Sequence, residues 1–223
     1  MGSGNRWLCA AVLLSGLTAL AERPPARGRP DPELFVATGA ADGMTPGARY
    51  LATLPAAARE VLRKEGRVVL DQKAKDDGLV RAVIRFERSP EEVFSIITRP
   101  SQQSRYLTHV SESKTVGGRT AEGESVDMEV AFLFVSLTYR IQHWFYPEEQ
   151  RMEWSLDPTG DNGLADQAGF FQLYALDEKT TIAEYGTRVI AKDGFLDFIR
   201  GLGERGGVAE ALTSLRRHVH TMK

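Results

Sequence analysis

Hydrophobic and polar residues alternate along much of the chain after residue 66, and a period of two residues predicts β-strands. The clearest example is residues 80–86, where Val80, Ala82, Ile84 and Phe86 alternate mainly with charged side chains. A strand of this kind has one face in the core and the other face toward water. Further strands are predicted at residues 68–73, 111–116, 124–134, 136–146, 151–156, 170–176 and 180–191.

The apolar positions change parity near residue 134, which predicts that the chain reverses direction there. They are even-numbered up to that point, as at Met128, and odd-numbered after it, as at Tyr139. Two antiparallel neighbours share a face only if their paired residue numbers have a fixed sum. We therefore expect a hairpin, with Glu129 and Arg140 forming a cross-strand pair on its surface.

Two short helices are predicted directly after the strand at residues 80–86. The run Ser89-Pro90-Glu91-Glu92 has Ser at the N-cap, Pro in the first turn and Glu at the third position, which is a capping box. Pro100 ends this helix, and residues 101–107 are expected to form the second one.

The last residues of the chain predict a long amphipathic helix. From Gly207 onward, apolar residues recur three or four positions apart, among them Leu212 and Leu215. Glu210 lies near the start of this segment and Arg216 near its end, and the helix dipole favours this distribution of charge.

The N-terminal 47 residues predict an export signal followed by a tether. In residues 1–21, Arg6 precedes an uncharged stretch over residues 7–20, and Ala19-Leu20-Ala21 is typical of a cleavage site. The stretch is shorter than the roughly 20 residues that span a bilayer. Residues 22–47 are rich in Pro and Gly and lack the apolar residues of a packed element. We expect an exported protein, periplasmic or secreted, with a retained anchor as the alternative.

Residues 48–65 predict a separate N-terminal helix, interrupted by Pro55 and ended by Gly66 as a C-cap. The remaining residues, 66–223, have the size of a single domain. No internal repeat is visible in them.

Composition excludes several classes of function. The chain has 223 residues, 42% hydrophobic and 26% charged, with a net charge of -2, so it has no overall positive field to hold a nucleic acid. Its single cysteine, Cys9, lies in the predicted signal. Cleavage of that signal would leave no thiol for a disulfide, a nucleophile or a metal site.

Searches for catalytic, metal and cofactor motifs give no site. Residues 201–206 match G-x-G-x-x-G, but a dinucleotide site needs a preceding strand and a later acidic residue, so we interpret them as a flexible break. His218 and His220 are two residues apart on a predicted helix and point in different directions, as surface histidines would. We therefore predict no catalytic residue, no metal and no cofactor.

The run from Arg88 to Phe94 after an alternating strand, together with the long terminal helix, resembles the START and polyketide cyclase-like (SRPBCC) superfamily, which includes the coenzyme Q-binding proteins. The resemblance covers residues 67–221. It implies an α+β helix-grip fold, in which a curved antiparallel sheet of about seven strands wraps around the C-terminal helix. It also implies a cavity between the sheet and that helix for an apolar ligand. Residues 99–107 depart from the pattern of the quinone-binding branch.

The residues expected to face this cavity are aromatic, apolar or imidazole side chains at inward positions. They are Tyr106, Met128, Tyr139, His143, Trp154, Phe171, Tyr185, Leu212 and Leu215. His143 has two interpretations, either a histidine bonded locally near the rim of the sheet or a general base or ligand donor. For the others, the alternative to lining a ligand is simple packing in the core.

These features predict an exported binding or transport protein for a lipid, quinone or polyketide-like molecule. One alternative is a cyclase- or hydrolase-type enzyme with the same cavity, and another is an interaction module of the cell envelope. Leu133 and Phe134 lie at the predicted reversal, which lacks the usual turn residues. This tip either packs against a neighbouring element, or makes a transient contact with a membrane or gates the cavity.

Overall fold

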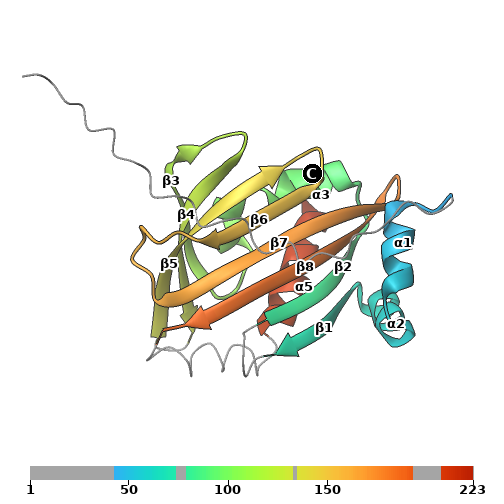
Figure 1. The fold of residues 1–223 in the computed structure, drawn as a ribbon, viewed down its shortest axis with the longest axis horizontal. Coiled ribbons are helices and arrows are strands. Elements are labelled where there is room, and N and C mark those ends of the chain that lie inside the picture. The colour runs from blue at the N-terminus through green and yellow to red at the C-terminus, as the bar shows by residue number, and fades with distance from the viewer. Residues whose placement is uncertain (1–42, 74–78, 133–134, 193–206, 223) are drawn as a thin grey trace, which may run out of the picture.

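The computed structural model describes residues 43–73, 79–132, 135–192 and 207–222 (Figure 1). The predicted signal, the tether as far as residue 42, the tip residues Leu133 and Phe134, and the glycine motif at 201–206 lie outside these residues.

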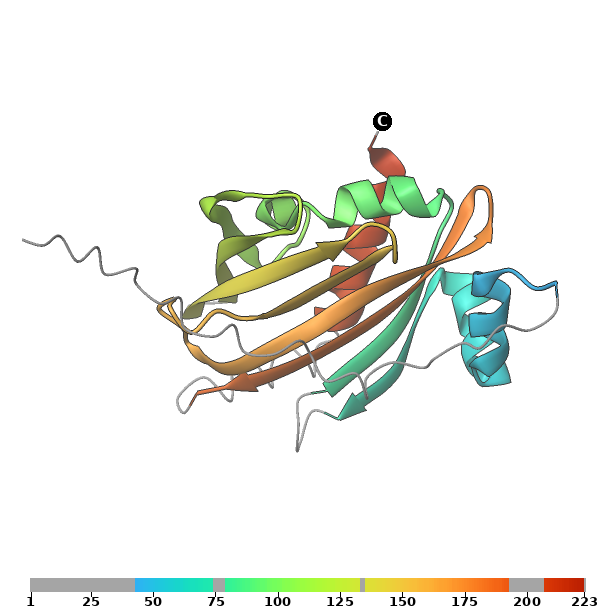
Figure 2. The ribbon, with the colours of Figure 1, turned by 45° about the horizontal axis from the view of Figure 1, so that its top comes forward.

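The described residues form an α+β fold, as predicted, built on one antiparallel sheet. The sheet has eight strands, where about seven were expected, in the order β1-β2-β8-β7-β6-β5-β4-β3. It curves around the terminal helix, which is the predicted helix-grip arrangement (Figures 1 and 2). The helices are α1 (Pro46–Thr53), α2 (Ala56–Glu65), α3 (Pro90–Ile97), the 3-10 helix η2 (Pro100–Arg105) and α5 (Gly207–Thr221). The strands are β1 (Arg67–Lys73), β2 (Leu79–Phe86), β3 (Val110–Arg119), β4 (Gly123–Phe132), β5 (Val135–Tyr146), β6 (Arg151–Leu156), β7 (Leu164–Asp177) and β8 (Thr180–Ala191).

The β4–β5 hairpin reverses where the parity change predicted. Phe132 pairs with Val135, and every other residue pair of the hairpin follows in step from this one. This register corrects the predicted ion pair. Arg140 lies opposite Asp127 and not Glu129, and its guanidinium binds both carboxylate oxygens of Asp127 at 2.6 and 3.0 Å. The sequence located the reversal but not the register, which the pairing of Phe132 with Val135 sets.

Strand β7 starts six residues before the predicted segment. Residues 164–169 include Asp166, Gln167 and Gly169, so their composition does not show a strand pattern. Pairing with the end of β8 extends the strand, since Leu164 lies opposite Ala191. Neighbouring backbone therefore outweighs weak local propensity.

The capping box of α3 forms as predicted. The Ser89 hydroxyl accepts a hydrogen bond from the Glu92 N–H, and the Glu92 carboxylate accepts one from the Ser89 N–H. A cap of this kind typically stabilises a helix by about 1 kcal/mol. It sets the start of α3, so that Val93, Ile96 and Ile97 turn into the core.

The N-terminal helices pack on the face of the sheet opposite α5. Tyr50 and Leu54 join a buried cluster with Val83 and Ile182, and the Tyr50 ring stacks on Tyr174 at 4.8 Å. Pro55 separates α1 from α2, and Gly66 ends α2 with a φ of 73°, both as predicted.

The start of α1 lies two residues before the predicted helix and is fixed by β7. The Thr45 hydroxyl donates a hydrogen bond to the carbonyl of Leu176 at 3.0 Å. A Cβ on Gly47 would lie 2.8 Å from the backbone of Ala175 and Leu176. Residues 45–47, which were assigned to the tether, therefore belong to the packed structure.

The main core lies between the concave face of the sheet and the helices α3 and α5. Ala82, Ile84 and Phe86 face this layer, while Val83 faces the N-terminal helices on the other side. Alternate residues of β2 thus enter two cores, which explains why the sequence there is apolar at most positions and not only at every second one.

Candidate functional site

All nine predicted ligand-facing residues lie in the layer between the sheet and its covering helices. Five are buried members of the main core, namely Met128, Trp154, Phe171, Leu212 and Leu215. Tyr106, Tyr139 and Tyr185 pack against that core and are only partly buried. His143 is buried on β5 and lies opposite Trp154 on β6. We call these nine residues the inner-face cluster.

The centre of the inner-face cluster is aromatic, and four strands supply its rings. The Trp154 ring on β6 lies 5.8 Å from Phe171 on β7 and 5.9 Å from Tyr185 on β8. Phe171 and Tyr185 are 4.9 Å apart, and His143 on β5 is 6.4 Å from Trp154. These are tilted contacts at distances that favour aromatic pairs.

Gly169 makes room for the Trp154 ring. The two residues are paired across β6 and β7, and a Cβ on Gly169 would lie 2.4 Å from Cζ2 of the indole. Any side chain at residue 169 would displace the ring. The same Cβ would lie 2.6 Å from the carbonyl oxygen of Gly186, so the glycine in the middle of β7 is explained by the close approach of the ring and of this backbone oxygen.

Tyr139 and Tyr185 bring hydroxyl groups into this apolar layer. Burial raises the pKa of Tyr185 to about 12, and burial also raises the pKa of Tyr139, so both phenols are neutral at physiological pH. Both side chains nevertheless keep accessible surface. Neutral phenols that are surrounded by protein and still accessible can bind the polar group of an otherwise apolar molecule.

His143 is a neutral imidazole. Burial lowers its pKa to about 3, and the charge of Arg119 acts in the same direction, while a hydrogen bond with the Glu124 backbone opposes them. The Nδ1 atom is buried and has no hydrogen-bond partner among the described residues. A group with a pKa so far below 7 is a weak general base at neutral pH, but it can form a hydrogen bond with a ligand.

Glu124 is a buried polar residue that the sequence analysis did not single out. It lies opposite His143, and its side chain is only 1% exposed. Its carboxylate accepts hydrogen bonds from the Ser101 N–H at 3.3 Å and from the Thr115 hydroxyl at 3.4 Å. Glu124 has an even residue number, as the inward-facing residues of β4 do, and this parity is the sequence signal that could have identified it.

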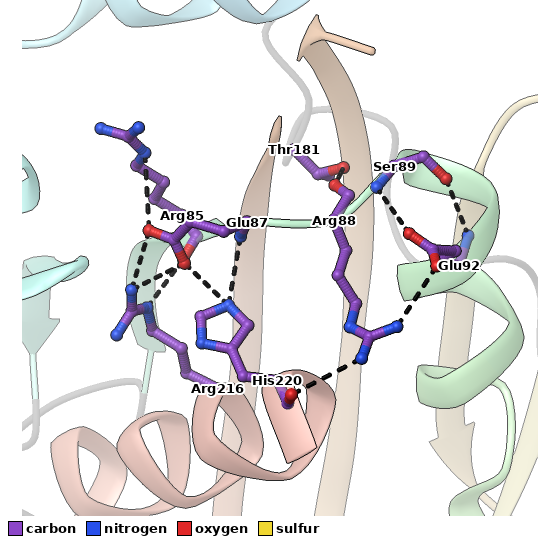
Figure 3. Close-up of polar contacts among 8 residues, drawn as sticks. All are labelled: Arg85, Glu87, Arg88, Ser89, Glu92, Thr181, Arg216 and His220. Atoms are coloured by element: carbon purple, nitrogen blue, oxygen red, sulfur yellow. Dashed lines mark hydrogen bonds and ion pairs between the residues drawn. The ribbon is translucent and has the colours of Figure 1, made fainter. Parts of the chain in front are cut away.

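The terminal helix is fastened to the connection between β2 and α3 (Figure 3). Glu87 accepts two hydrogen bonds from Arg216 at 2.8 and 2.9 Å, and Arg216 also donates to the carbonyl of Arg85 at 2.9 Å. Arg88 reaches the carbonyl of Met222 and pairs with Glu92 at 3.2 Å. These contacts hold the C-terminal half of α5 over the sheet.

The two histidines of α5 are not simply exposed, which corrects that expectation. His218 stacks on Tyr106 with ring centroids 4.2 Å apart, and Nε2 of His220 accepts a hydrogen bond from the Glu87 N–H at 3.1 Å. Their rings point to different partners, because side chains two positions apart on a helix point in different directions. The sequence predicted that the two side chains point apart, but it could not predict which residues they contact.

The end of the inner face near the β4–β5 tip is less enclosed than the part under α5. Leu137 and Leu164 are buried there, but the apolar side chains around them keep accessible surface. The partly buried side chains are Val130, Tyr139, Leu156 and Val189.

Within the part of the chain that the structure describes, no group of three or more His, Cys, Asp or Glu side chains could hold a metal ion. In the same residues, no helix combines the length and the apolar character needed to cross a membrane.

No family model and no curated protein matches the sequence. Solved structures do match. A STAR-related lipid transfer protein from Xanthomonas axonopodis has a TM-score of 0.55 with 10% identity, covering 70% of this chain and 95% of that one. A START superfamily protein from Mycobacterium smegmatis has a TM-score of 0.51 with 17% identity, covering 65% and 99%. The chain has the helix-grip fold of START and polyketide cyclase-like proteins.

The helix-grip fold is shared by proteins with different activities. A ZhuI aromatase/cyclase from a Streptomyces species also matches, with a TM-score of 0.55 and 10% identity, covering 65% of this chain and 94% of that one. At such low identity, the likeness of these helix-grip proteins establishes the fold and not the reaction or the ligand.

Proposed function

We propose that this protein binds and carries an apolar molecule between the sheet and α5, with a lipid, an isoprenoid quinone or a polyketide-like compound as the ligand class. The inner-face cluster carries this proposal, because its tyrosines are surrounded by protein and yet keep accessible surface. Its aromatic rings supply apolar area, and the phenols and His143 supply a few polar groups, which is the usual composition of a small-molecule site. Lipid transfer proteins and aromatase/cyclases with this fold support the proposal.

The first test is native mass spectrometry of the full chain purified from its own cells. A co-purifying apolar molecule is expected, and its mass would identify the ligand class. Uptake of a fluorescent fatty acid provides an independent measurement. Absence of both a bound molecule and uptake would contradict the proposal and favour the interaction module.

An enzyme of the cyclase type is the second candidate, because His143 and Glu124 place two buried polar groups opposite each other. His143→Phe distinguishes the two functions. A carrier should retain its ligand within a few-fold, since the aromatic body remains. A catalytic imidazole contributes about 100- to 10,000-fold to a rate, so a loss of turnover on that scale with intact binding would establish the enzyme.

We also propose that the protein is exported and exchanges its ligand at a membrane. The signal-like sequence of residues 1–21 supports export, and the apolar sequence of Leu133 and Phe134, between the paired residues Phe132 and Val135, supports membrane contact. Each such side chain contributes roughly 1.5 to 3 kcal/mol when it is buried in a bilayer. Leu133→Asp with Phe134→Ser should therefore abolish liposome flotation and leave the melting temperature nearly unchanged. Unfolding of the double variant, with no flotation of the parent protein, would show that the tip is core.

A further inference from the structure

An open hollow of about 480 Å³ lies beside the end of α3, the start of η2 and the end of β3. Ser95 on α3 and Arg99 at the N-cap of η2 are exposed, whereas Val93, Ile96 and Ile97 of α3 are buried in the core. Ser95 and Arg99 therefore face the outer side of α3, while Arg119 reaches the hollow from beside Phe145 of the main core. The lining residues are Ser95, Thr98, Arg99, Ser101, Gln102 and Arg119.

Arg119 is held in place at this hollow. Its guanidinium lies 4.6 Å from the centre of the Phe145 ring, and Nη1 donates a hydrogen bond to the carbonyl of Thr98. The side chain remains 43% exposed. A cation that is already oriented loses little side-chain entropy when it binds a ligand.

The lining carries two positive charges and no acidic side chain. Glu124 is the nearby carboxylate, 3.7 Å from Arg119, but it is buried and accepts hydrogen bonds from Ser101 and Thr115. Arg99 is exposed, and its side chain has no hydrogen bond or ion pair among the described residues. The hollow therefore has a net positive charge, to which Ser101 and Gln102 add neutral donors.

We propose that this hollow is a binding site for a phosphate group, held between Arg99 and Arg119. Guanidinium groups form the strong, charge-assisted hydrogen bonds that proteins use for phosphate. The two groups approach from different parts of the fold, Arg99 from the N-cap of η2 and Arg119 from the end of β3, which suits a tetrahedral anion with oxygens in several directions. The volume exceeds that of a bare phosphate and leaves room for a substituent, either in a soluble phosphate ester or in a phospholipid head group. None of its lining residues belongs to the inner-face cluster, so the phosphate proposal does not depend on the carrier proposal.

The test is a calorimetric titration of the full chain with inorganic phosphate. Saturable binding is expected, and Arg99→Gln should weaken it at least about tenfold, because one charged partner is lost. The matched control is Arg217→Gln, which removes an exposed arginine of α5 outside the hollow and should leave the affinity unchanged. If both variants have the melting temperature of the parent protein, neither change acts through folding.

Flotation with liposomes distinguishes the two sources of phosphate. Vesicles of phosphatidylglycerol and phosphatidylcholine are compared with vesicles of phosphatidylcholine alone. Flotation with the anionic vesicles that Arg99→Gln reduces and Arg217→Gln does not would assign the site to a phospholipid head group. Binding of inorganic phosphate without such flotation would assign it to a soluble phosphate. Equal behaviour of both variants in both measurements would overturn the proposal.

Discussion

A single imidazole gives this protein a defined dependence of stability on pH. His143 has an ordinary pKa of 6.5, and burial lowers it to about 3 in the folded chain. Between these two values the unfolded chain binds a proton that the folded chain does not, so stability falls as the pH falls through this window. Above pH 6.5 both states are neutral at this group, and its full contribution is present.

We therefore expect His143 to cost the fold about 3 kcal/mol of stability at pH 4 relative to pH 7. Urea unfolding of the parent protein and of His143→Phe at both pH values measures this contribution. The variant should lose less stability on acidification than the parent. An equal loss in both proteins would show that His143 is accessible and titrates normally.

Gly169 provides a second prediction for a single residue. Gly169→Ala places a Cβ against the Trp154 ring and should destabilise the fold by about 1 to 3 kcal/mol, as overpacking does. Chemical denaturation measures the loss. Combining it with Trp154→Phe removes the clashing part of the indole, so the alanine should then cost less than in the parent. Additive effects would mean that the clash is not the cause.

Among the elements, α5 closes the inner layer against the sheet, and its substitution tests the proposed ligand site. Leu212, Leu215 and Val219 are buried against the sheet, and contacts at the β2–α3 connection fasten the helix. Polar contacts also hold its first half, where Arg67 donates a hydrogen bond to Thr213 at 2.6 Å and His109 lies 3.7 Å from the Glu210 carboxylate. The position of α5 is thus fixed along its length, and its apolar face forms one wall of the layer.

Leu215→Trp should fill space next to this wall and abolish fatty acid uptake, with the protein still folded. In a layer without space, the same overpacking costs about 1 to 3 kcal/mol. Uptake and thermal unfolding of the same sample distinguish the two cases. A folded variant with unchanged uptake would place the ligand elsewhere.

For the molecule as a whole, the N-terminal helices belong to the folded unit. Tyr50 and Leu54 are buried against the sheet, and Thr45 and Gly47 contact β7. Deleting residues 1–42 should leave the melting temperature nearly unchanged. Deleting residues 1–55 removes these two buried side chains and should cost about 3 kcal/mol or more, on the scale of about 1.5 to 3 for each side chain. Equal melting temperatures of the two truncated proteins would show that α1 contributes nothing.

Local signals in the sequence determined the elements of this protein. The capping box of α3, the break at Pro55, the C-cap at Gly66 and the reversal after Phe132 each depend on a few neighbouring residues, and each is present in the structure. The strand period also placed the strand residues of the inner-face cluster, because side chains alternate between the two faces of a strand whatever the strand pairs with, and the helical period placed Leu212 and Leu215.

Tertiary structure decided what depends on partners far along the chain. The pairing of Arg140 with Asp127, the early start of β7, the contacts of His218 and His220, and the hollow between Arg99 and Arg119 all join separate elements. No local pattern encodes such contacts, because register and packing are fixed only when the strands and helices assemble. The burial that lowers the pKa of His143 likewise arises from the assembled layer and not from its neighbours in sequence.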